Sequence, residues 1–347
     1  MFKIDQFDLE ESKKTFIIAE LSANHNQDFD IAAKTIRAAK EAGADAIKLQ
    51  TYTADTITLD CDNEYFQIKQ GTLWDGTTLH KLYEQAYTPW EWQPKLMQIA
   101  VEEGLICFSS PFDKTSVDFL EELNVPAYKI ASFEITDIPL IEYVASKGKP
   151  VIISTGIAEL FEIYEAVDAC RRMANNQIAL LKCTSAYPAS PKEANLLTIP
   201  DMKLRFSTVV GLSDHTLGSD TAIASVALGA KIIEKHFILN KEIGGPDASF
   251  SMEPKEFKQM INSIRTVEHS LGSASYDLTE KSKNNRHFSR SLFVVEDMKK
   301  GDFFTEKNIR SIRPGNGLPP KYMPSILGKR ALCDIKRGTP LNEKYFN

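Results

Sequence analysis

The sequence has few cysteines and no long apolar run. Its five cysteines are odd in number, dispersed and never arranged as CxxC, so we expect free thiols rather than a disulfide framework. No stretch approaches the roughly 20 apolar residues of a membrane span, and the N-terminal MFKIDQFDLEESKK has no apolar signal core. These absences predict a cytoplasmic protein with no membrane association.

A basic surface is also missing. The formal net charge is -6, with 41 basic and 47 acidic residues mixed along the chain, whereas a nucleic-acid-binding protein would present a basic face. A small anionic substrate stays compatible with this charge, because local Lys, Arg and backbone N–H groups can hold an anion within an acidic protein. Hydrophobic residues form 43% of the chain, so a sizeable core is available.

What the sequence does have is an alternation of short apolar runs with segments of helical period. Runs that are apolar on both faces, with a helix between each pair, indicate parallel strands joined by right-handed crossovers. Eight such units predict an α/β protein with a (β/α)8 TIM barrel over residues 1–272, and a doubly wound open sheet is the alternative. The predicted strands are residues 16–21, 45–50, 105–110, 127–132, 150–155, 178–183, 208–214 and 231–237.

Three segments depart from this repeat. The connection 51–88 is much longer than an ordinary βα loop and is rich in aromatic residues, so we expect it to cover the active site. Residues 273–289 are polar and lack hydrophobic period, which predicts a linker. Residues 290–347 combine short alternating runs with Gly- and Pro-containing turns, which indicates a small separate β-rich domain.

Polar residues gather at the carboxyl ends of the predicted strands, the end at which barrel enzymes carry their active sites. Lys48 and Lys129 lie within strands, where a charged side chain must be paired or must serve a ligand. Together with hydroxyl groups at neighbouring strand ends, these lysines predict a pocket for a phosphate and a carboxylate. The other polar residues at or near the strand ends are Glu20, Gln50, Tyr52, Ser109, Ser132, Glu134, Ser154, Thr184, Tyr187 and Ser213.

His215 and His236 end consecutive predicted strands, so we expect them to be neighbours. Two imidazoles at adjacent strand ends, near Glu20 and Asp247, can bind a divalent metal while leaving positions open for substrate and water. Zinc suits two imidazoles on softness alone, whereas Mn2+ or Mg2+ becomes plausible if substrate oxygens and waters complete the shell. The alternative is that each histidine only donates to a backbone carbonyl.

Collinear motifs run along almost the whole chain: FIIAELSANHNQD, DAIKLQTYTADT, YKIASFEI, LKCTSAYPA, VGLSDHT, EKHF, and the tail SLFVVEDMKKGDFFTEKNIRSIRPGNGLPP. In these motifs the chain resembles the sialic acid synthase family. That resemblance implies condensation of phosphoenolpyruvate with an N-acetylated amino sugar to a nine-carbon ketosugar acid and phosphate. It also implies an antifreeze-like (SAF) domain over residues 290–347 that reaches over the partner's barrel in a domain-swapped homodimer.

Within the family, residues 71–93 (GTLWDGTTLHKLYEQAYTPWEWQ) resemble the pseudaminic acid synthases. The sugar that this implies is 2,4-diacetamido-2,4,6-trideoxy-L-altrose, and N-acetylneuraminate or legionaminate synthesis by the same chemistry is the alternative. A sugar with two acetamido groups and fewer hydroxyls is more apolar, which suits an aromatic covering segment.

The family resemblance, together with the strand-end pattern, assigns roles to individual residues. His215 and His236 would hold a divalent metal, Mn2+ or Mg2+, and Glu20 would handle protons on the attacking water. Thr184 stands where relatives resembling the neuraminate enzymes carry Asn, so Ser185 could make that contact instead. The phosphoenolpyruvate candidates are Lys48, Ser109, Lys129, Ser132, Ser154, Thr184 and Ser213, and the sugar candidates are Gln50, Tyr52, Glu134, Tyr187, Asp247 and the partner subunit's Arg313.

Two other classes of function stay open at this point. A Schiff-base aldolase would use Lys129 or Lys48 as its nucleophile, with a lowered lysine pKa and no metal. A non-catalytic carbohydrate- or ice-binding protein is suggested by the tail alone. The density of polar strand ends argues against the second class, because a binding surface would not require two histidines surrounded by charged residues.

Overall fold

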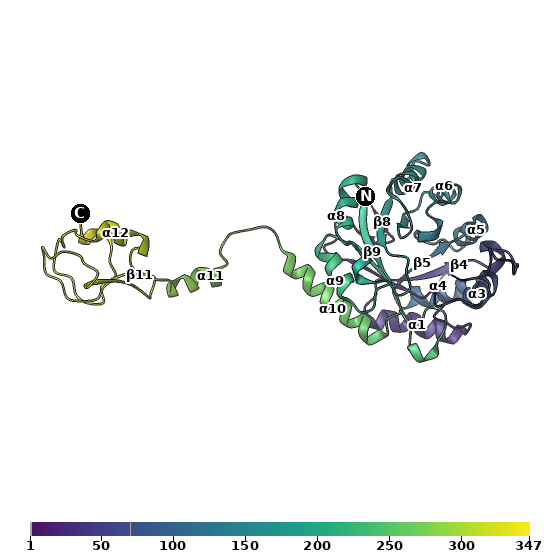
Figure 1. The fold of residues 1–347 in the computed structure, drawn as a ribbon, viewed down its shortest axis with the longest axis horizontal. Coiled ribbons are helices and arrows are strands. Elements are labelled where there is room, and N and C mark those ends of the chain that lie inside the picture. Colours follow the sequence, from purple (N-terminus) through teal and green to yellow (C-terminus); the bar gives the residue numbers. More distant parts are fainter. Residues whose placement is uncertain (1, 70) are drawn as a thin grey trace. The chain divides into compact units, whose positions relative to one another are not determined.

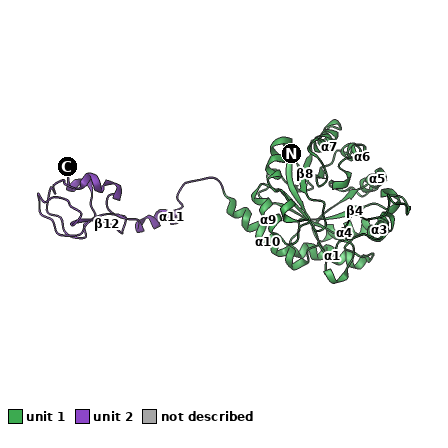
Figure 2. Ribbon diagram, viewed as in Figure 1, with its two compact units in different colours: residues 1–272 green, residues 273–347 purple. Residues whose placement is uncertain are grey.

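The structure is a computed structural model that describes residues 2–69 and 71–347. The chain divides into two compact units, Met1–Gly272 and Ser273–Asn347, coloured separately in Figure 2. Within the described residues, none of the helices combines the length and the apolar character that a bilayer crossing requires.

The first unit is a closed barrel of eight parallel strands with helices around its outside (Figure 1). The last strand pairs with the first, His236 opposite Glu20, so the sheet has no edge strand. This closure confirms the predicted TIM barrel and excludes the open sheet. The strands are β3 (Phe16–Glu20), β4 (Ala46–Thr51), β5 (Ile106–Pro111), β6 (Tyr128–Ile130), β7 (Val151–Ser154), β8 (Ile178–Cys183), β9 (Val209–Asp214) and β10 (Ile232–His236).

Local sequence signals begin and end the surrounding helices. The Asp28 carboxylate accepts a hydrogen bond from the Ile31 N–H at the start of the first helix, which ends at Gly43 with a φ of 100°, a value that favours glycine. Asp113 caps another helix in the same way. The main helices are α1 (Phe29–Ala42), α4 (Gln93–Glu102), α5 (Lys114–Glu122), α6 (Ile138–Ala145), α7 (Leu160–Arg172), α8 (Thr198–Phe206), α9 (Asp220–Ala227) and α10 (Pro254–Leu271).

A short N-terminal hairpin, β1 (Lys3–Ile4) with β2 (Phe7–Asp8), packs against the amino ends of the strands. Its buried Ile4 joins the inward-facing side chains of the barrel, among them Phe16 and Ile232, in one apolar cluster. The outward-facing strand residues pack instead against the helices in a larger cluster. The sequence of this segment shows only that an apolar signal core is missing, and the hairpin was not predicted. Because the hairpin and its cluster fill the amino end, the opposite end is left for polar chemistry.

The long connection after β4 contains two short helices, α2 (Ala54–Ile57) and α3 (Leu79–Ala86). Its Trp74 indole N–H donates to the Pro246 carbonyl at 3.1 Å, in the loop after β10. The Trp74 ring also lies 5.6 Å, centroid to centroid, from the ring of Tyr187, which follows β8. The connection therefore reaches across to two other loops at the carboxyl end of the barrel.

The second unit is small and built around one antiparallel pair, β11 (Ser291–Val294) with β12 (Ile309–Ile312). Isolated bridges such as Phe293 with Pro340 extend the pairing. A helix, α11 (Glu280–Asn285), lies within the stretch that was predicted as a linker, and α12 (Met323–Ile326) follows later. The core is formed by Leu292, Val294, Met298, Phe304, Ile309, Ile326, Ala331, Ile335 and Leu341.

Candidate active site

Beyond the apolar inner cluster, the barrel carries a layer of inward-facing polar side chains, here called the polar layer. Side chains alternate along a strand, so residues two positions after an inner-cluster residue face the same way. Lys48 follows Ala46 in this manner, and Ser110 follows Phe108. The layer consists of Glu20, Lys48, Ser110, Lys129, Ser154, Cys183, Ser213 and Glu234, each at most 5% exposed.

Lys48 and Glu20 form the closest ion pair of this layer, with 2.6 Å between Nζ and Oε2. Lys48 Nζ also donates to Ser110 Oγ at 3.3 Å, and the Gln50 amide donates to Glu20 Oε1 at 3.2 Å. Burial raises the pKa of the Glu20 carboxyl to about 7, against the opposite pull of the Lys48 ammonium. Glu20 can therefore exchange a proton near neutral pH, which is what a general acid or base needs.

Lys129, on β6, is the second lysine of the polar layer. Its Nζ donates to Ser154 Oγ at 2.6 Å and to a backbone carbonyl at 3.0 Å. Glu234 lies between the two lysines, with a carboxylate oxygen 3.9 Å from each Nζ, and accepts a hydrogen bond from Ser213 at 3.0 Å. Burial alone would raise the pKa of Glu234, but the two ammonium groups outweigh it and leave that pKa lowered.

The turn after β7 contacts hydroxyl groups at neighbouring strand ends. The Gly156 N–H donates to Ser132 Oγ at 3.2 Å. A Cβ atom at Gly156 would lie 2.1 Å from Ser185 Oγ and 2.7 Å from Ser132 Oγ, so a larger residue would displace these hydroxyls. Two buried ammonium groups with several hydroxyls beside them form an arrangement suited to a small multivalent anion.

His215 and His236 meet at the same end of the barrel, with ring centroids 5.3 Å apart. His215 Nδ1 lies 3.0 Å from the Thr184 carbonyl oxygen. His236 Nδ1 is buried, has no hydrogen-bond partner among the described residues, and lies 3.7 Å from a carboxylate oxygen of Asp247. Burial lowers the pKa of His236 well below its usual range, so this imidazole is neutral.

This pair of imidazoles fits a divalent metal, although the protein alone does not complete a metal site. No group of three or more His, Cys, Asp or Glu side chains with metal-binding spacing occurs in residues 2–69 and 71–347. The buried, unpartnered nitrogen of the neutral His236 nevertheless offers the lone pair that a metal requires. His215 and His236 would then supply two ligands, and substrate oxygens and water the rest.

An aromatic group surrounds the two histidines. The Tyr187 ring lies 4.5 Å from that of His215, and the Phe250 ring lies 4.9 Å from that of His236, centroid to centroid. Tyr187 and Phe250 are themselves 5.3 Å apart, and Trp74 lies beyond Tyr187. A ligand that approaches the histidines from this side meets an apolar wall.

Carboxylates border the same space. Asp247 accepts a hydrogen bond of 2.5 Å from Ser22. Glu134, in the turn after β6, is partly buried, and its Oε2 lacks a hydrogen-bond partner within the described part of the chain. Burial raises the pKa of Glu134 to about 7. Tyr52 is buried beside Tyr83, with ring centroids 5.7 Å apart.

Two predicted site residues have side chains that do not lie where they were expected. Ser109 faces outward, with its hydroxyl 2.7 Å from that of Thr51, so Ser110 is the hydroxyl beside Lys48. The Thr184 hydroxyl turns away and donates to the Glu193 carbonyl at 3.2 Å; only the Thr184 backbone faces His215. Arg313 lies in the second unit, as expected, and is exposed; its contact with the partner's barrel stays a prediction.

The polar layer also contains residues that were not predicted as site residues. Glu234 faces inward because it lies two positions before His236, which also faces inward. Cys183 faces inward because it lies two positions after Leu181 of the inner apolar cluster. Glu234 is recognisable in the sequence as a polar residue of the eighth predicted strand, two positions before His236, but it was given no role in the site. Phe250 lies in a loop without regular period, and no comparable signal marked it.

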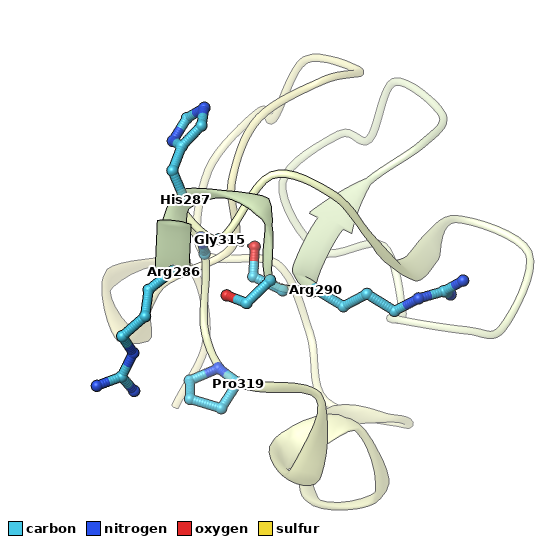
Figure 3. Close-up of a pocket in the computed structure, with 8 residues that line it drawn as sticks. Arg286, His287, Arg290, Gly315 and Pro319 are labelled. Atoms are coloured by element: carbon cyan, nitrogen blue, oxygen red, sulfur yellow. Dashed lines mark hydrogen bonds between the residues drawn. The ribbon is translucent and has the colours of Figure 1, made fainter. Parts of the chain in front are cut away.

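Two cavities lie outside the polar layer. One, of about 480 Å3, is lined by Trp74, Pro246 and neighbouring residues of the covering connection. The other, of about 400 Å3, lies in the second unit between residues 286–291 and 315–319 (Figure 3). The labelled side chains of Arg286, His287 and Arg290 point in different directions there, so they do not converge on one anion.

Comparison with known proteins gives a consistent result along the whole chain. The profile of the NeuB family matches residues 35–276, and that of the SAF domain matches residues 289–344. The pseudaminic acid synthase of Campylobacter jejuni is 48% identical over 334 residues, 96% of this chain and 97% of that protein. The pseudaminic acid synthase of Helicobacter pylori is 48% identical over 327 residues, 94% and 96% of the two chains. A solved N-acetylneuraminic acid synthetase from Leptospira borgpetersenii is 30% identical, with a TM-score of 0.70, over 78% of this chain and 90% of that one.

Proposed function

The chain belongs to the NeuB family, and from that premise we propose that it catalyses the reaction of a pseudaminic acid synthase. It condenses phosphoenolpyruvate with 2,4-diacetamido-2,4,6-trideoxy-L-altrose, and water enters the reaction, to give pseudaminic acid and phosphate. The choice of sugar rests on the 48% identity to pseudaminic acid synthases over nearly the full length of both chains.

The polar layer supports the phosphoenolpyruvate part of the proposal. Phosphoenolpyruvate carries a phosphate and a carboxylate, and Lys48 and Lys129 are two buried ammonium groups that could hold one each. The hydroxyls of Ser110, Ser132 and Ser154 would supply further hydrogen bonds. Ser110 replaces Ser109 in this set, because Ser110 is the serine that faces inward.

In the proposed reaction, C3 of phosphoenolpyruvate forms a bond to the aldehyde carbon of the open-chain sugar, and the aldehyde oxygen takes a proton. This leaves C2 electron-poor, and water adds to it and loses a proton. The C2 hydroxyl then becomes the carbonyl of the ketosugar acid and its proton passes to the departing phosphate, as the bond from C2 to the bridging oxygen breaks. We assign Glu20 the role of accepting the proton of the water. Its pKa, raised to about 7, and the contacts of its two oxygens with Gln50 and Lys48 support this role.

His215 and His236 would hold a divalent cation, Mn2+ or Mg2+, which when bound supplies a Lewis acid for the aldehyde oxygen. The protein's own contribution is to keep His236 neutral and its Nδ1 free. Thr184, whose carbonyl lies 3.0 Å from His215 Nδ1, orients the other imidazole.

The aromatic residues near the histidines support a comparatively apolar sugar. Tyr187, Phe250 and Trp74 would contact its methyl and acetamido groups, and Asp247 and Glu134 would bind its polar atoms. Gln50 and Tyr52 would complete the sugar side. We further propose a homodimer in which the partner subunit's Arg313 reaches this site. All five cysteines are free, which suits the reducing cytoplasm as the place of reaction.

The test is phosphate release from phosphoenolpyruvate with a panel of sugars in the presence of Mn2+. We expect the diacetamido-trideoxy-altrose to be used with the highest kcat/KM. A preference for N-acetylmannosamine would instead indicate an N-acetylneuraminate synthase, and a preference for the corresponding mannose isomer a legionaminate synthase. With 18O in the bridging position of phosphoenolpyruvate, the label should leave with phosphate, and its retention in the ketosugar acid would contradict the proposed bond cleavage.

A further inference from the structure

Each of the two candidate metal ligands is preceded in the chain by one member of a buried ion pair. Asp214 precedes His215, Lys235 precedes His236, and the ion-pair residues lie opposite each other in the parallel ladder of β9 and β10. Lys235 Nζ is 2.8 Å from Asp214 Oδ2, and both side chains are 1% exposed. Since side chains alternate along a strand, this pair lies on the outer side of the barrel wall while His236 faces inward.

The same ion pair holds the turn that follows β9. Lys235 Nζ donates a second hydrogen bond, of 2.6 Å, to the Thr216 carbonyl. Asp214 Oδ1 accepts two hydrogen bonds from Thr216, one from its backbone N–H at 2.9 Å and one from its hydroxyl at 2.8 Å. Asp214 and Thr216 therefore flank His215 in the chain, and Lys235 bonds to both of them. Lys235 itself directly precedes His236.

Stability alone does not account for this arrangement. Taking two charges out of water is unfavourable, and well-packed apolar residues of the same volume often stabilise a fold equally well or better. An ion pair of this kind also constrains the relative position of the groups that it joins, because each of its hydrogen bonds fixes a distance and an angle. Groups that orient metal ligands from behind commonly tune metal affinity.

We propose that Asp214 and Lys235 are positioning residues that keep His215 and His236 at the separation at which both imidazoles bind one divalent ion. The pair couples the end of β9 to the end of β10, so a shift of one histidine is resisted through the backbone of the other. This inference rests on the metal assignment within the proposed function, and it concerns the residues behind that site.

The test is the double substitution D214N/K235M, which removes both charges with little change in volume. Mn2+ binding to the metal-stripped full-length protein is measured by the paramagnetic resonance signal of free Mn2+. We expect the dissociation constant to rise by about 10-fold, the lower end of the range for outer-shell partners of metal ligands, because the pair acts on the histidines through the backbone and not by direct contact. Hydrogen exchange of the backbone amides over residues 214–217 should also become faster, because the turn has lost its anchor.

A second variant and a control separate positioning from general destabilisation. T216V keeps both charges and removes only the hydroxyl bond to Asp214, so we expect a smaller rise in the Mn2+ dissociation constant. The control is D45N/R265M, which breaks a partly buried ion pair of 3.3 Å at the amino end of the barrel. It should lower the melting temperature and leave Mn2+ affinity unchanged.

The proposal is overturned if D214N/K235M binds Mn2+ as wild type does, or if the control weakens binding equally. Should the double variant fail to fold, unchanged Mn2+ affinity in T216V overturns it. Failure of the metal assignment is a distinct result, since H215A would then bind Mn2+ as tightly as wild type does.

Discussion

Glu234 is the buried carboxylate that faces both lysines of the polar layer, so the substitution E234Q tests whether that layer is charged. The carboxylate lies 3.9 Å from Lys48 Nζ and 3.9 Å from Lys129 Nζ, and the residue is 5% exposed. Glutamine keeps the shape of the side chain and an oxygen that can accept from Ser213, as the carboxylate does now. The change therefore removes a charge and little else.

The magnitude follows from these distances. At an effective dielectric constant of about 20, two unit charges about 4 Å apart interact by about 4 kcal/mol, so two such pairs give roughly 8 kcal/mol. Desolvation of the buried carboxylate offsets several kcal/mol of this attraction. We expect E234Q to lower the free energy of unfolding by about 3–5 kcal/mol, the range typical when one partner of a buried ion pair is removed.

The assay is urea unfolding at neutral pH, with and without phosphoenolpyruvate. Without ligand E234Q should be less stable than wild type, but the ligand should stabilise it more, because a competing negative charge has left the anion pocket. E234D, which keeps the charge, is the control. Its unfolding free energy without ligand and its stabilisation by phosphoenolpyruvate should both be closer to those of wild type. If E234Q and wild type had equal unfolding free energies without ligand, the polar layer would not carry the charges assigned to it. If phosphoenolpyruvate stabilised E234Q less than wild type, the Glu234 carboxylate would not compete with the ligand.

Three further substitutions test other parts of the molecule. W74A removes the hydrogen bond to the Pro246 carbonyl and the contact with Tyr187. In steady-state kinetics the KM for the sugar should therefore rise while the KM for phosphoenolpyruvate changes little, and W74F should have an intermediate KM for the sugar. G211A places a Cβ 2.4 Å from the Ile232 carbonyl oxygen inside the barrel, and overpacking of this kind should lower the free energy of unfolding in urea by about 1–3 kcal/mol. I4A empties a fully buried position in the N-terminal hairpin and should cost about 2–5 kcal/mol in the same assay; a loss below about 1 kcal/mol would mean that the hairpin does not stabilise the barrel.

The barrel was predictable because its eight strands are apolar on both faces and are separated by capped helices. The predicted run 178–183 coincides with β8, and β5, Ile106–Pro111, is displaced by one residue from its prediction. The N-terminal hairpin was missed because its strands have two residues each, too few for any period to be seen. Its apolar residues alternate with charged ones, and only the structure shows that Ile4 packs beneath the barrel.

The candidate site was predictable at the level of strand ends and less so at the level of single residues. Ser109 and Ser110 are both polar and adjacent, and only the direction in which β5 presents them decides which one reaches Lys48. Thr184 shows a second limit. Its role toward His215 is carried by a backbone carbonyl, which every residue type possesses, so the identity of the side chain says nothing about it.

The sequence Glu234-Lys235-His236 shows why the register of this barrel must be held closely. Alternation sends Glu234 and His236 into the polar layer and Lys235 to the outer side, where it meets Asp214. A shift of β10 by one residue would bring Lys235 inward and place two charged or polar groups against the helices. The outer ion pair forms only in the observed register, because Lys235 and Asp214 are opposite each other only there. The same contact that would position the histidines thus also selects against the misregistered barrel.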